Sequence, residues 1–316
     1  MGKYIIKRII QALPLLLVIS VLSFALIKLA PGDPVQAYVT PKMSPEQVEI
    51  VRHNLGLDKP VYVQFLLWLK NVLKGDLGYS LVNYRPITVQ IAERIPATLG
   101  LMGTSLIISI IVGIFLGLIS AFYKNKFIDE FISLLSYIGI SIPSFWYAMI
   151  LIVFLSGKFR LFPSVGMRTV GVNTTIDLLK HFVLPSLVLS FQNTAVITRY
   201  IRSNAITQLK EDYVRTAVSK GLNRKMVFAK HVLRNILLPI VTIIGMSLPD
   251  LIAGAFITET IFGWPGMGRL GINAIFSYDY PLIMAITMLT SIMVILGNLL
   301  SDILYGIVDP RIKVVK

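Results

Sequence analysis

The sequence predicts an all-α membrane protein with six transmembrane helices and a polar insert after the first helix. Of its 316 residues, 55% are apolar and only 15% are charged, whereas soluble chains carry about a quarter charged residues. The mean hydropathy is +0.75. Because a helix needs about 20 apolar residues to cross a bilayer, six stretches qualify as spans: Ile9–Ile27, Ala97–Tyr123, Phe131–Gly157, Phe182–Thr198, Asn235–Thr258 and Pro281–Ser301.

The first predicted unit, residues 1–30, holds a short N-terminal segment and the first span. Three basic residues, Lys3, Lys7 and Arg8, precede the span, as they would in a signal peptide. Its apolar run is longer than the usual 7–15 residues or so of a signal peptide. We therefore expect the segment to be retained as a membrane helix.

The second predicted unit is an extracytoplasmic insert at residues 31–96, and residues 97–316 form the remaining five-helix core. The motif PGDP at 31–34 ends the first span, since its prolines cannot continue a helix. Ser44-Pro45-Glu46 predicts a capped helix that runs to about Asn54. Val63–Leu73 has the spacing of an amphipathic helix.

The placement of lysine and arginine orients the chain in the membrane. Basic residues concentrate in the N-terminal segment, the connection 124–130, the segment 199–234 and the C-terminal tail. Short basic connections stay cytoplasmic, so both termini are expected inside. The net charge of +14 then reflects membrane topology, and we expect no binding of nucleic acid.

The sequence lacks the patterns that would predict an enzyme, so the expected catalytic and metal residues are none. It contains no cysteine and no GxxxxGK[ST] loop for nucleotide phosphates. The histidines His53, His181 and His231 are far apart in the predicted topology. His181 is expected to be a solvated residue at a membrane boundary.

Polar residues inside two spans are candidates for a solute pathway. Asp250 is the one ionisable residue deep in a predicted span, and intramembrane carboxylates are costly and often functional. Its open interpretations are a proton relay, a cation ligand, a pathway-lining group and an arginine partner. Gln192 and Asn193 interrupt the fourth span, either to bond other helices or to line a polar route.

Two glycine-rich motifs predict close packing or a break in helix. GIFLG places Gly113 and Gly117 four residues apart, which lets helix backbones approach closely, within this chain or between subunits. ETIFGWPGMGRL at 259–270 breaks helix and carries an aromatic pair. It predicts a re-entrant or interfacial segment at the outer mouth, with Trp264, Pro265 and Gly266 as gate candidates.

The segment 203–234 is long, polar and basic, and it has the pattern of two helices separated by a glycine. Ser203–Lys220 has the periodicity of an amphipathic helix, Gly221 follows it as a helix-ending glycine, and Asn223 can cap a second helix. A basic amphipathic helix can lie on anionic lipid. A short knob between two helices can also fit a groove on a partner protein, and both interpretations are open at this point.

Motifs along the whole chain resemble the dipeptide, oligopeptide and nickel group of ABC importer permeases, in particular the subunit that carries the PGDP insert. The matching motifs, in order, are PGDP at 31–34, LGLDKPVYVQFLLWL at 55–69, GDLGYS at 75–80, PATL at 96–99, DYVRTAVSKGL at 212–222, KHVLRNILLP at 230–239, FGWPGMGRL at 262–270, DYP at 279–281 and DPR at 309–311. The general importer pattern has Glu-Ala-Ala where this chain has Arg215-Thr216-Ala217, and proline where it has Arg234. This departure favours the peptide and nickel branch.

The resemblance implies a type I ABC importer permease fold, a location in a bacterial or archaeal cytoplasmic (inner) membrane, and a set of partners. These are a second, homologous permease subunit, two cytoplasmic ATPase subunits that bind ATP and Mg, an extracytoplasmic substrate-binding protein and the lipid bilayer. This chain itself would need no cofactor. The resemblance makes 203–234 a cytoplasmic coupling segment, and the residues implied in ATPase coupling are Asp212, Tyr213, Arg215, Thr216, Ala217, Lys220, Gly221 and Leu222.

The expected function is therefore half of the translocation pathway of an ATP-driven importer of di- or oligopeptides. One alternative is an importer of nickel or a nickel chelate, because the same motifs occur there. A more distant alternative is an ion-coupled secondary carrier that uses Asp250. A third class, an intramembrane enzyme, lacks the required constellation of residues.

Overall fold

The computed structural model describes residues 2–29, 35, 39, 43–54, 56–223 and 226–308. The regular elements in these ranges are all helices. The PGDP motif and the DPR motif lie outside the described residues. In chain order the helices are α1 (Gly2–Leu29), α2 (Pro45–Asn54), α3 (Val61–Leu73), α4 (Ile87–Phe122), α5 (Phe127–Ser141), α6 (Ser144–Leu151), the π-helix η2 (Ile152–Lys158), α7 (Thr175–Gln208), α8 (Asp212–Ser219), the π-helix η3 (Val227–Val232), α10 (Leu233–Ala253), α11 (Phe256–Ile261), α12 (Met267–Phe276) and α13 (Tyr280–Val308).

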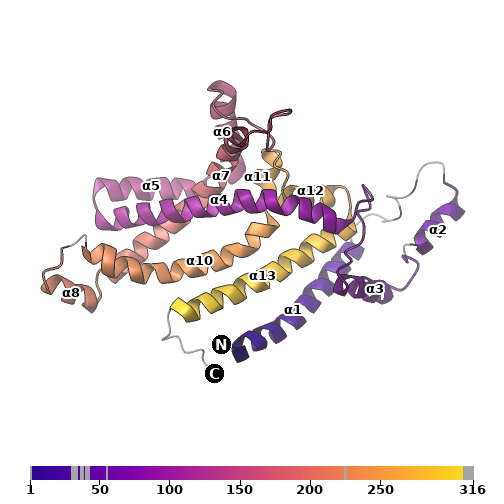
Figure 1. Cartoon of the computed structure of the whole chain (residues 1–316), viewed down its shortest axis with the longest axis horizontal. Coiled ribbons are helices and arrows are strands. Elements are labelled where there is room, and N and C mark those ends of the chain that lie inside the picture. The colour runs from indigo at the N-terminus through magenta and orange to yellow at the C-terminus, as the bar shows by residue number, and fades with distance from the viewer. Residues whose placement is uncertain are drawn as a thin grey trace.

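The long helices lie side by side along the long axis of the molecule (Figure 1). The start of α1, the end of α13 and the short helix α8 lie toward one end, which we call the α8 end. The helices α2, α3, α11 and α12 lie toward the opposite end, which we call the outer end. The segments predicted to share one side of the membrane therefore lie at one end of the fold.

In the part of the chain that the structure describes, four helical segments are long and apolar enough to cross a bilayer, and the bent pair α5–α6 makes a fifth. The four are Ile10–Leu29, Ile87–Phe122, Ile243–Ile261 and Tyr280–Leu300. The fourth predicted span, Phe182–Thr198, lies inside α7, which has 34 residues and is therefore about 51 Å long. The chain is a multi-pass helical membrane protein.

The third predicted span, Phe131–Gly157, is not one continuous helix. The chain bends by 105° between α5 and the following α6–η2 unit. The cause is Pro143, because the residue before a proline is pushed into extended backbone and Ile142 has φ −77° and ψ 125°. The dipeptide Ile142-Pro143 was the signal for this break.

Two other predicted boundaries differ from the structure. The helix α4 begins at Ile87, earlier than Ala97, and continues through Pro96. The fifth predicted span is interrupted at Gly254, whose φ of +79° is a left-handed conformation that glycine tolerates. The helix α10 ends there and α11 begins at Phe256.

Both helices predicted in the insert are confirmed. At the start of α2, the Gln47 amide donates to Ser44 Oγ (3.3 Å) and the Ser44 amide donates to Gln47 Oε1 (2.9 Å), which is a capping box. The helix α3 packs on α1 through aromatic contacts of Phe24 with Phe65 and Trp68. The amphipathic face of α3 therefore lies against the first membrane helix.

The two glycines of GIFLG pack within the chain, where α4 crosses α7. A Cβ on Gly113 would lie 2.7 Å from Ile197 Cγ2, and a Cβ on Gly117 would lie 2.6 Å from Ile201 Cβ. Contacts this short leave no room for a side chain, so the glycines let the two backbones approach. Intramolecular packing accounts for the motif.

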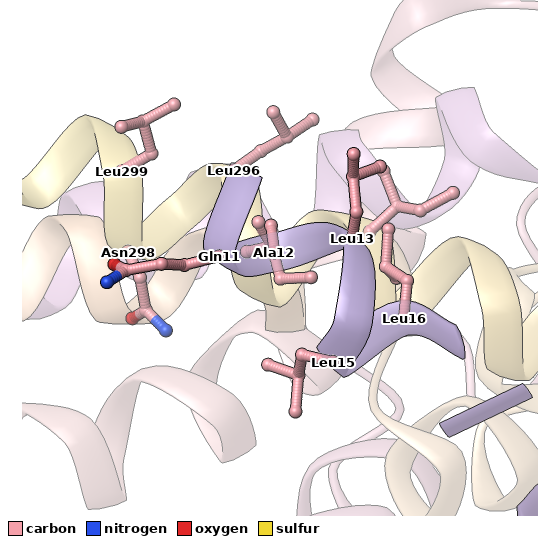
Figure 2. Close-up of a pocket in the computed structure, with 10 residues that line it drawn as sticks. Gln11, Ala12, Leu13, Leu15, Leu16, Leu296, Asn298 and Leu299 are labelled. Atoms are coloured by element: carbon pink, nitrogen blue, oxygen red, sulfur yellow. The ribbon is translucent and has the colours of Figure 1, made fainter. Parts of the chain in front are cut away.

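A groove of about 290 Å³ lies between α1 and α13 (Figure 2). Most of its lining is leucine and isoleucine, and the side chains of Gln11 and Asn298 lie at one end of it. The groove shows that α1 and α13 pack loosely at this level.

Candidate coupling and translocation site

The predicted helix Ser203–Lys220 is two helices in the structure. The helix α7 ends at Gln208, and α8 begins at Asp212 after Glu211 adopts extended backbone (φ −70°, ψ 149°). The break lets α8 turn back toward the bundle, so that its apolar face packs on the ends of other helices. Tyr213 Oη donates to Gln208 Oε1 (2.7 Å) across the turn.

The helix α8 rests on an apolar cluster, which we call the α8 cluster. Val214 and Ala217 are 5% exposed and pack in it. The other buried members come from α4, α7, η3 and α10: Ala121, Ile197, Ile201, Ala205, Val227, Phe228, Val232, Ile236 and Ile240. Because close-packed interiors transmit strain, a displacement of α8 would also displace the parts of α4, α7 and α10 that pack against it.

The opposite face of α8 is polar and exposed. Among the predicted coupling residues, Asp212 and Arg215 have side chains that are 96% and 75% exposed. Thr216, Lys220 and Gly221 are also exposed, Tyr213 and Leu222 are half-buried, and Ala217 points inward. Val218 is not among the predicted coupling residues, but it is 55% exposed and lies off the apolar face of the helix.

Gly221 ends α8 in a Schellman motif. Its φ is +84°, its amide donates to Val218 O (2.9 Å), and the Leu222 amide donates to Ala217 O (3.2 Å). Asn223 then begins the next helical segment, since its Oδ1 accepts from the Met226 amide (2.8 Å). The predicted order of helix, glycine and capped helix is present from Asp212 onward.

At the outer end, the segment 259–270 is organised around one buried carboxylate, Glu259. Its side chain is 0% exposed and accepts from Thr98 Oγ1 (3.0 Å) and from the Arg269 amide (2.9 Å). A Cβ on Gly266 would collide with this carboxylate, and one on Gly254 would lie 2.6 Å from it. The glycines of the segment therefore make room for Glu259.

The three gate candidates of this segment lie inside the chain rather than at a free edge. Trp264 is fully buried, donates from Nε1 to Ala97 O (2.9 Å) and packs edge-to-face on Phe182. Gly266 is buried and Pro265 is half-buried beside it. Sequence reasoning did not single out Glu259, whose partner Thr98 is 161 residues away.

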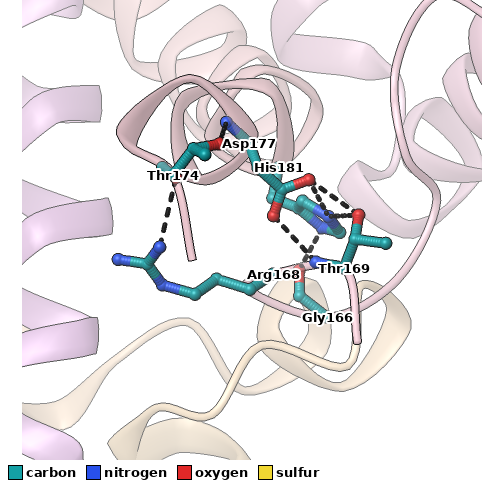
Figure 3. Close-up of polar contacts among 6 residues, drawn as sticks. All are labelled: Gly166, Arg168, Thr169, Thr174, Asp177 and His181. Carbon is teal, nitrogen blue, oxygen red and sulfur yellow. Dashed lines mark hydrogen bonds and ion pairs between the residues drawn. The ribbon is translucent and has the colours of Figure 1, made fainter. Parts of the chain in front are cut away.

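His181 was predicted to be solvated, and this prediction is wrong. The residue is 5% exposed, and its Nδ1 lies 2.9 Å from Gly166 O while its Nε2 lies 3.2 Å from Thr169 Oγ1 (Figure 3). The connection 159–174 folds over the histidine, which local sequence did not reveal. We call His181, Asp177, Thr169 and Gly166 the His181 latch.

Asp177 completes the His181 latch at the first turn of α7. The Thr169 hydroxyl and amide donate to its carboxylate at 2.7 and 2.8 Å (Figure 3). These two hydrogen bonds hold the pKa of Asp177 below its ordinary value, because they favour the charged form. Gly166 in turn donates from its amide to Phe262 O (2.7 Å), so the latch is tied to the segment 259–270.

The remaining pathway candidates lie on two different helices. Gln192 and Asn193 are exposed on α7, and Asp250 is exposed near the end of α10. Polar side chains on the surface of a membrane helix face a bundle, a partner or a water-filled cavity. The surface of this single chain therefore leaves all three available to a second subunit or a solute.

These features define a class of protein. The chain is a multi-pass helical membrane protein with a buried polar centre at its outer end and an exposed polar helix, seated on an apolar cluster, at the other. Within the described residues no group of three or more His, Cys, Asp or Glu side chains is arranged to hold a metal ion.

The chain belongs to the binding-protein-dependent transport system inner membrane component family. The family model matches residues 113–314, and the N-terminal model of the same family matches residues 1–102. Oligopeptide transport system permease protein AppB of Bacillus subtilis is 44% identical over 315 residues, which are 99% of this chain and 100% of that protein. Glutathione transport system permease protein GsiC of Escherichia coli K12 is 38% identical over 99% of each chain.

The fold is similar to that of a solved transporter. A chain of the inward-facing MetNI methionine ABC transporter matches with a TM-score of 0.56 and 16% identity, over 70% of this chain and 97% of that one. The structural match supports the type I importer fold. The chain is thus a membrane component of a transport system.

Proposed function

We propose that this chain is one permease subunit of an ATP-driven importer of di- or oligopeptides, and that α8 with Gly221 docks on a cytoplasmic ATPase. The observation that carries the proposal is the contrast between the two faces of α8. Its inner face is anchored by Val214 and Ala217, and its outer face is exposed and polar. Such an element can transmit force, because both the partner and the bundle bear on it.

The docking interpretation is favoured over adsorption to lipid by the composition of the exposed face. A helix on a membrane surface buries a broad apolar face in the lipid, but the apolar face of α8 is used inside the chain. Asp212 also places an acid at its start. The outward residues Asp212, Arg215, Thr216 and Lys220 are suited to a polar groove.

The proposed assembly contains a second, homologous permease subunit, two ATPase subunits and an extracytoplasmic binding protein. ATP and Mg are bound by the ATPases, and this chain carries no cofactor. With α7 as a spanning helix and α5–α6 as a bent span, the chain crosses the membrane six times and both termini are cytoplasmic. The basic residues of segment 199–234 support this orientation.

Peptides are the proposed cargo. The relatives described above are named for oligopeptides and glutathione, and others of similar identity are named as peptide permeases. These names favour peptides over nickel. Gln192, Asn193 and Asp250 are proposed to line the pathway between the two permease subunits.

Gly221→Val tests the docking role. A β-branched residue is strained at φ +84°, so the Schellman motif and the tip of the knob should be lost. We expect uptake of peptide into proteoliposomes and co-purification of the ATPase to fall by at least about tenfold, which corresponds to about 1.4 kcal/mol. Membrane insertion should be unchanged.

Gly171→Val is the matched control. Gly171 has a φ of +81°, and like Gly221 it has open space within 4 Å of the point where a Cβ would lie. Gly171 lies in the connection before α7 and is therefore outside the segment proposed to dock, whereas Gly221 lies within that segment. Normal assembly and uptake in Gly221→Val would refute the docking role. ATP-independent uptake that collapses with Asp250→Asn would instead establish a secondary carrier.

A further inference from the structure

A second buried carboxylate, Asp129, joins three segments beside the α8 cluster. Asp129 is 2% exposed and accepts four hydrogen bonds. Ser120 Oγ of α4 donates at 2.5 Å, and the Asn125 amide of the α4–α5 turn donates at 2.9 Å. Arg202 of α7 donates from Nε at 2.6 Å and from Nη2 at 2.8 Å. These four hydrogen bonds connect the carboxylate of α5 to α4, to the α4–α5 turn and to α7.

Arg199 makes a second contact between α5 and α7, close to Arg202. The Arg199 guanidinium lies 4.4 Å from the centroid of the Tyr137 ring, which is a cation–π geometry. Arg199 and Arg202 are three residues apart and therefore share a face of α7. The two arginines fix α5 against the same stretch of α7.

That stretch of α7 also carries the α8 cluster. Ile201, the neighbour of Arg202 in sequence, is 1% exposed and packs in the cluster with Val214 and Ala217 of α8. The described members of the cluster come from α4, α7, α8, η3 and α10, and none of them is in α5. Apolar packing thus connects α8 to α4, α7 and α10. The helix α5 is outside this cluster: it packs on α7 farther along, where Gly139 lies against Ala195 and Phe191, and beside the cluster it is held by the ion pair.

We propose that Asp129 and Arg202 form a clamp that makes α5, and with it the bent α5–α6 span, follow the movement of α8. They are positioning residues, and the proposal rests on the proposed docking of α8 with an ATPase. The physical reason is that a bidentate arginine–carboxylate pair has a directed geometry. If α7 slid past α5, a buried charge would lose its partner, so the two helices move as one unit.

The test uses the reconstituted complex of permease subunits, ATPases and binding protein in proteoliposomes, with a peptide as the transported probe. In Asp129→Asn we expect assembly and the rate of ATP hydrolysis to stay as in the wild type. The number of peptides taken up per ATP should fall roughly two- to thirtyfold, the range seen for residues that couple two sites. An unchanged ratio would overturn the clamp.

A covalent cross-link tests whether the connection between α5 and α7 itself maintains coupling, independently of the ion pair. The chain has no cysteine, so the double variant Asp129→Cys with Arg202→Cys carries one unique pair of thiols. With the thiols unlinked, uptake per ATP should be low, and a bifunctional maleimide that joins them should restore it. A formed link that leaves the ratio low contradicts the proposal.

Two further variants keep the test decisive. If Asp129→Asn does not assemble, Arg202→Lys keeps the charge but loses the two-pronged bond, and a wild-type ratio there overturns the clamp. Arg85→Gln breaks an ion pair of equal length (2.6 Å) at the outer end, and an equal loss in that variant also counts against it. Failure of the proposed function looks different, since the wild type would then neither bind ATPases nor show ATP-dependent uptake.

Discussion

The outer end and the α8 end of the molecule each contain a buried carboxylate that accepts several hydrogen bonds, Glu259 and Asp129, but the donors around the two carboxylates differ. Glu259 accepts from the Arg269 backbone amide within its own segment and from Thr98 of α4, and the backbone at Gly254 and Gly266 lies directly against its carboxylate. Asp129 is held mainly by side chains from other helices. The outer end is thus a locked backbone turn, whereas the α8 end is a set of whole helices joined to one another.

The difference teaches where movement is possible. A turn whose backbone is packed against its own carboxylate cannot change without unfolding locally, because buried donors would lose their acceptor. Helices joined by side chains can rotate or translate together while every bond is kept. We therefore expect the outer segment 259–270 to act as a fixed block, and the α8 end to carry the conformational change.

The largest expected effect comes from breaking the fixed block. Glu259→Ala leaves Thr98 Oγ1 and the Arg269 amide without their buried acceptor. At about 1–3 kcal/mol for each unsatisfied donor, the loss of stability is roughly 2–6 kcal/mol. The measurement is the thermal unfolding midpoint of the purified protein in detergent. Glu93→Ala, at a side chain that is 48% exposed, should have little effect, and equal midpoints for the two variants would contradict the block.

A smaller change in stability, with opposite signs at two sites, is expected when two glycines of α4 are replaced by alanine. Gly117→Ala places a Cβ 2.6 Å from Ile201 Cβ and 2.8 Å from Thr198 O, and overpacking of this kind costs about 1–3 kcal/mol. Gly103, in the same helix, has nothing within 4 Å. Gly103→Ala should therefore stabilise by about 0.5–1 kcal/mol through helix propensity. Unfolding midpoints of both variants check the signs, and a stabilised Gly117→Ala would refute the close approach of α4 and α7.

The smallest effect concerns the His181 latch and depends on pH. Because hydrogen bonds from Thr169 hold the pKa of Asp177 below its ordinary value of 3.8, the charged form stabilises the fold. This stabilisation is fully present above pH 3.8 and is lost as the pH falls through the lower pKa of the folded state. Asp177→Asn should lower the unfolding midpoint at neutral pH, and the difference should shrink below pH 3.8. A difference between Asp177→Asn and the wild type that stays constant over this pH range would rule out the linkage.

Local sequence was sufficient for features that depend on neighbours in the chain. The capping box at Ser44, the Schellman glycine Gly221 and the cap at Asn223 are all set by residues within a few positions. The break at Ile142-Pro143 was equally local and was missed only because the run is apolar throughout. Periodicity and hydropathy do not register a single proline in such a run.

Features that depend on distant residues could not be predicted. Asp129 and Arg202 are 73 residues apart, and Glu259 and Thr98 are 161 residues apart. Nothing in a charged residue near a predicted span tells whether it faces water or a partner from another helix. His181 was assigned to water for this reason, although Thr169 and Gly166 cover it. The motifs predict where the candidate site lies along the chain, but they do not predict these hydrogen bonds between distant helices.

The pairing of α1 with α13 has a consequence for biosynthesis. The two helices line a common groove, yet about 250 residues separate Leu29 from Tyr280, and a ribosome adds about 5–20 residues per second. After insertion, α1 therefore waits roughly 10–50 s in the bilayer before α13 is made. During that time its leucine-rich face is covered by lipid, and docking of α13 must displace that lipid late in assembly.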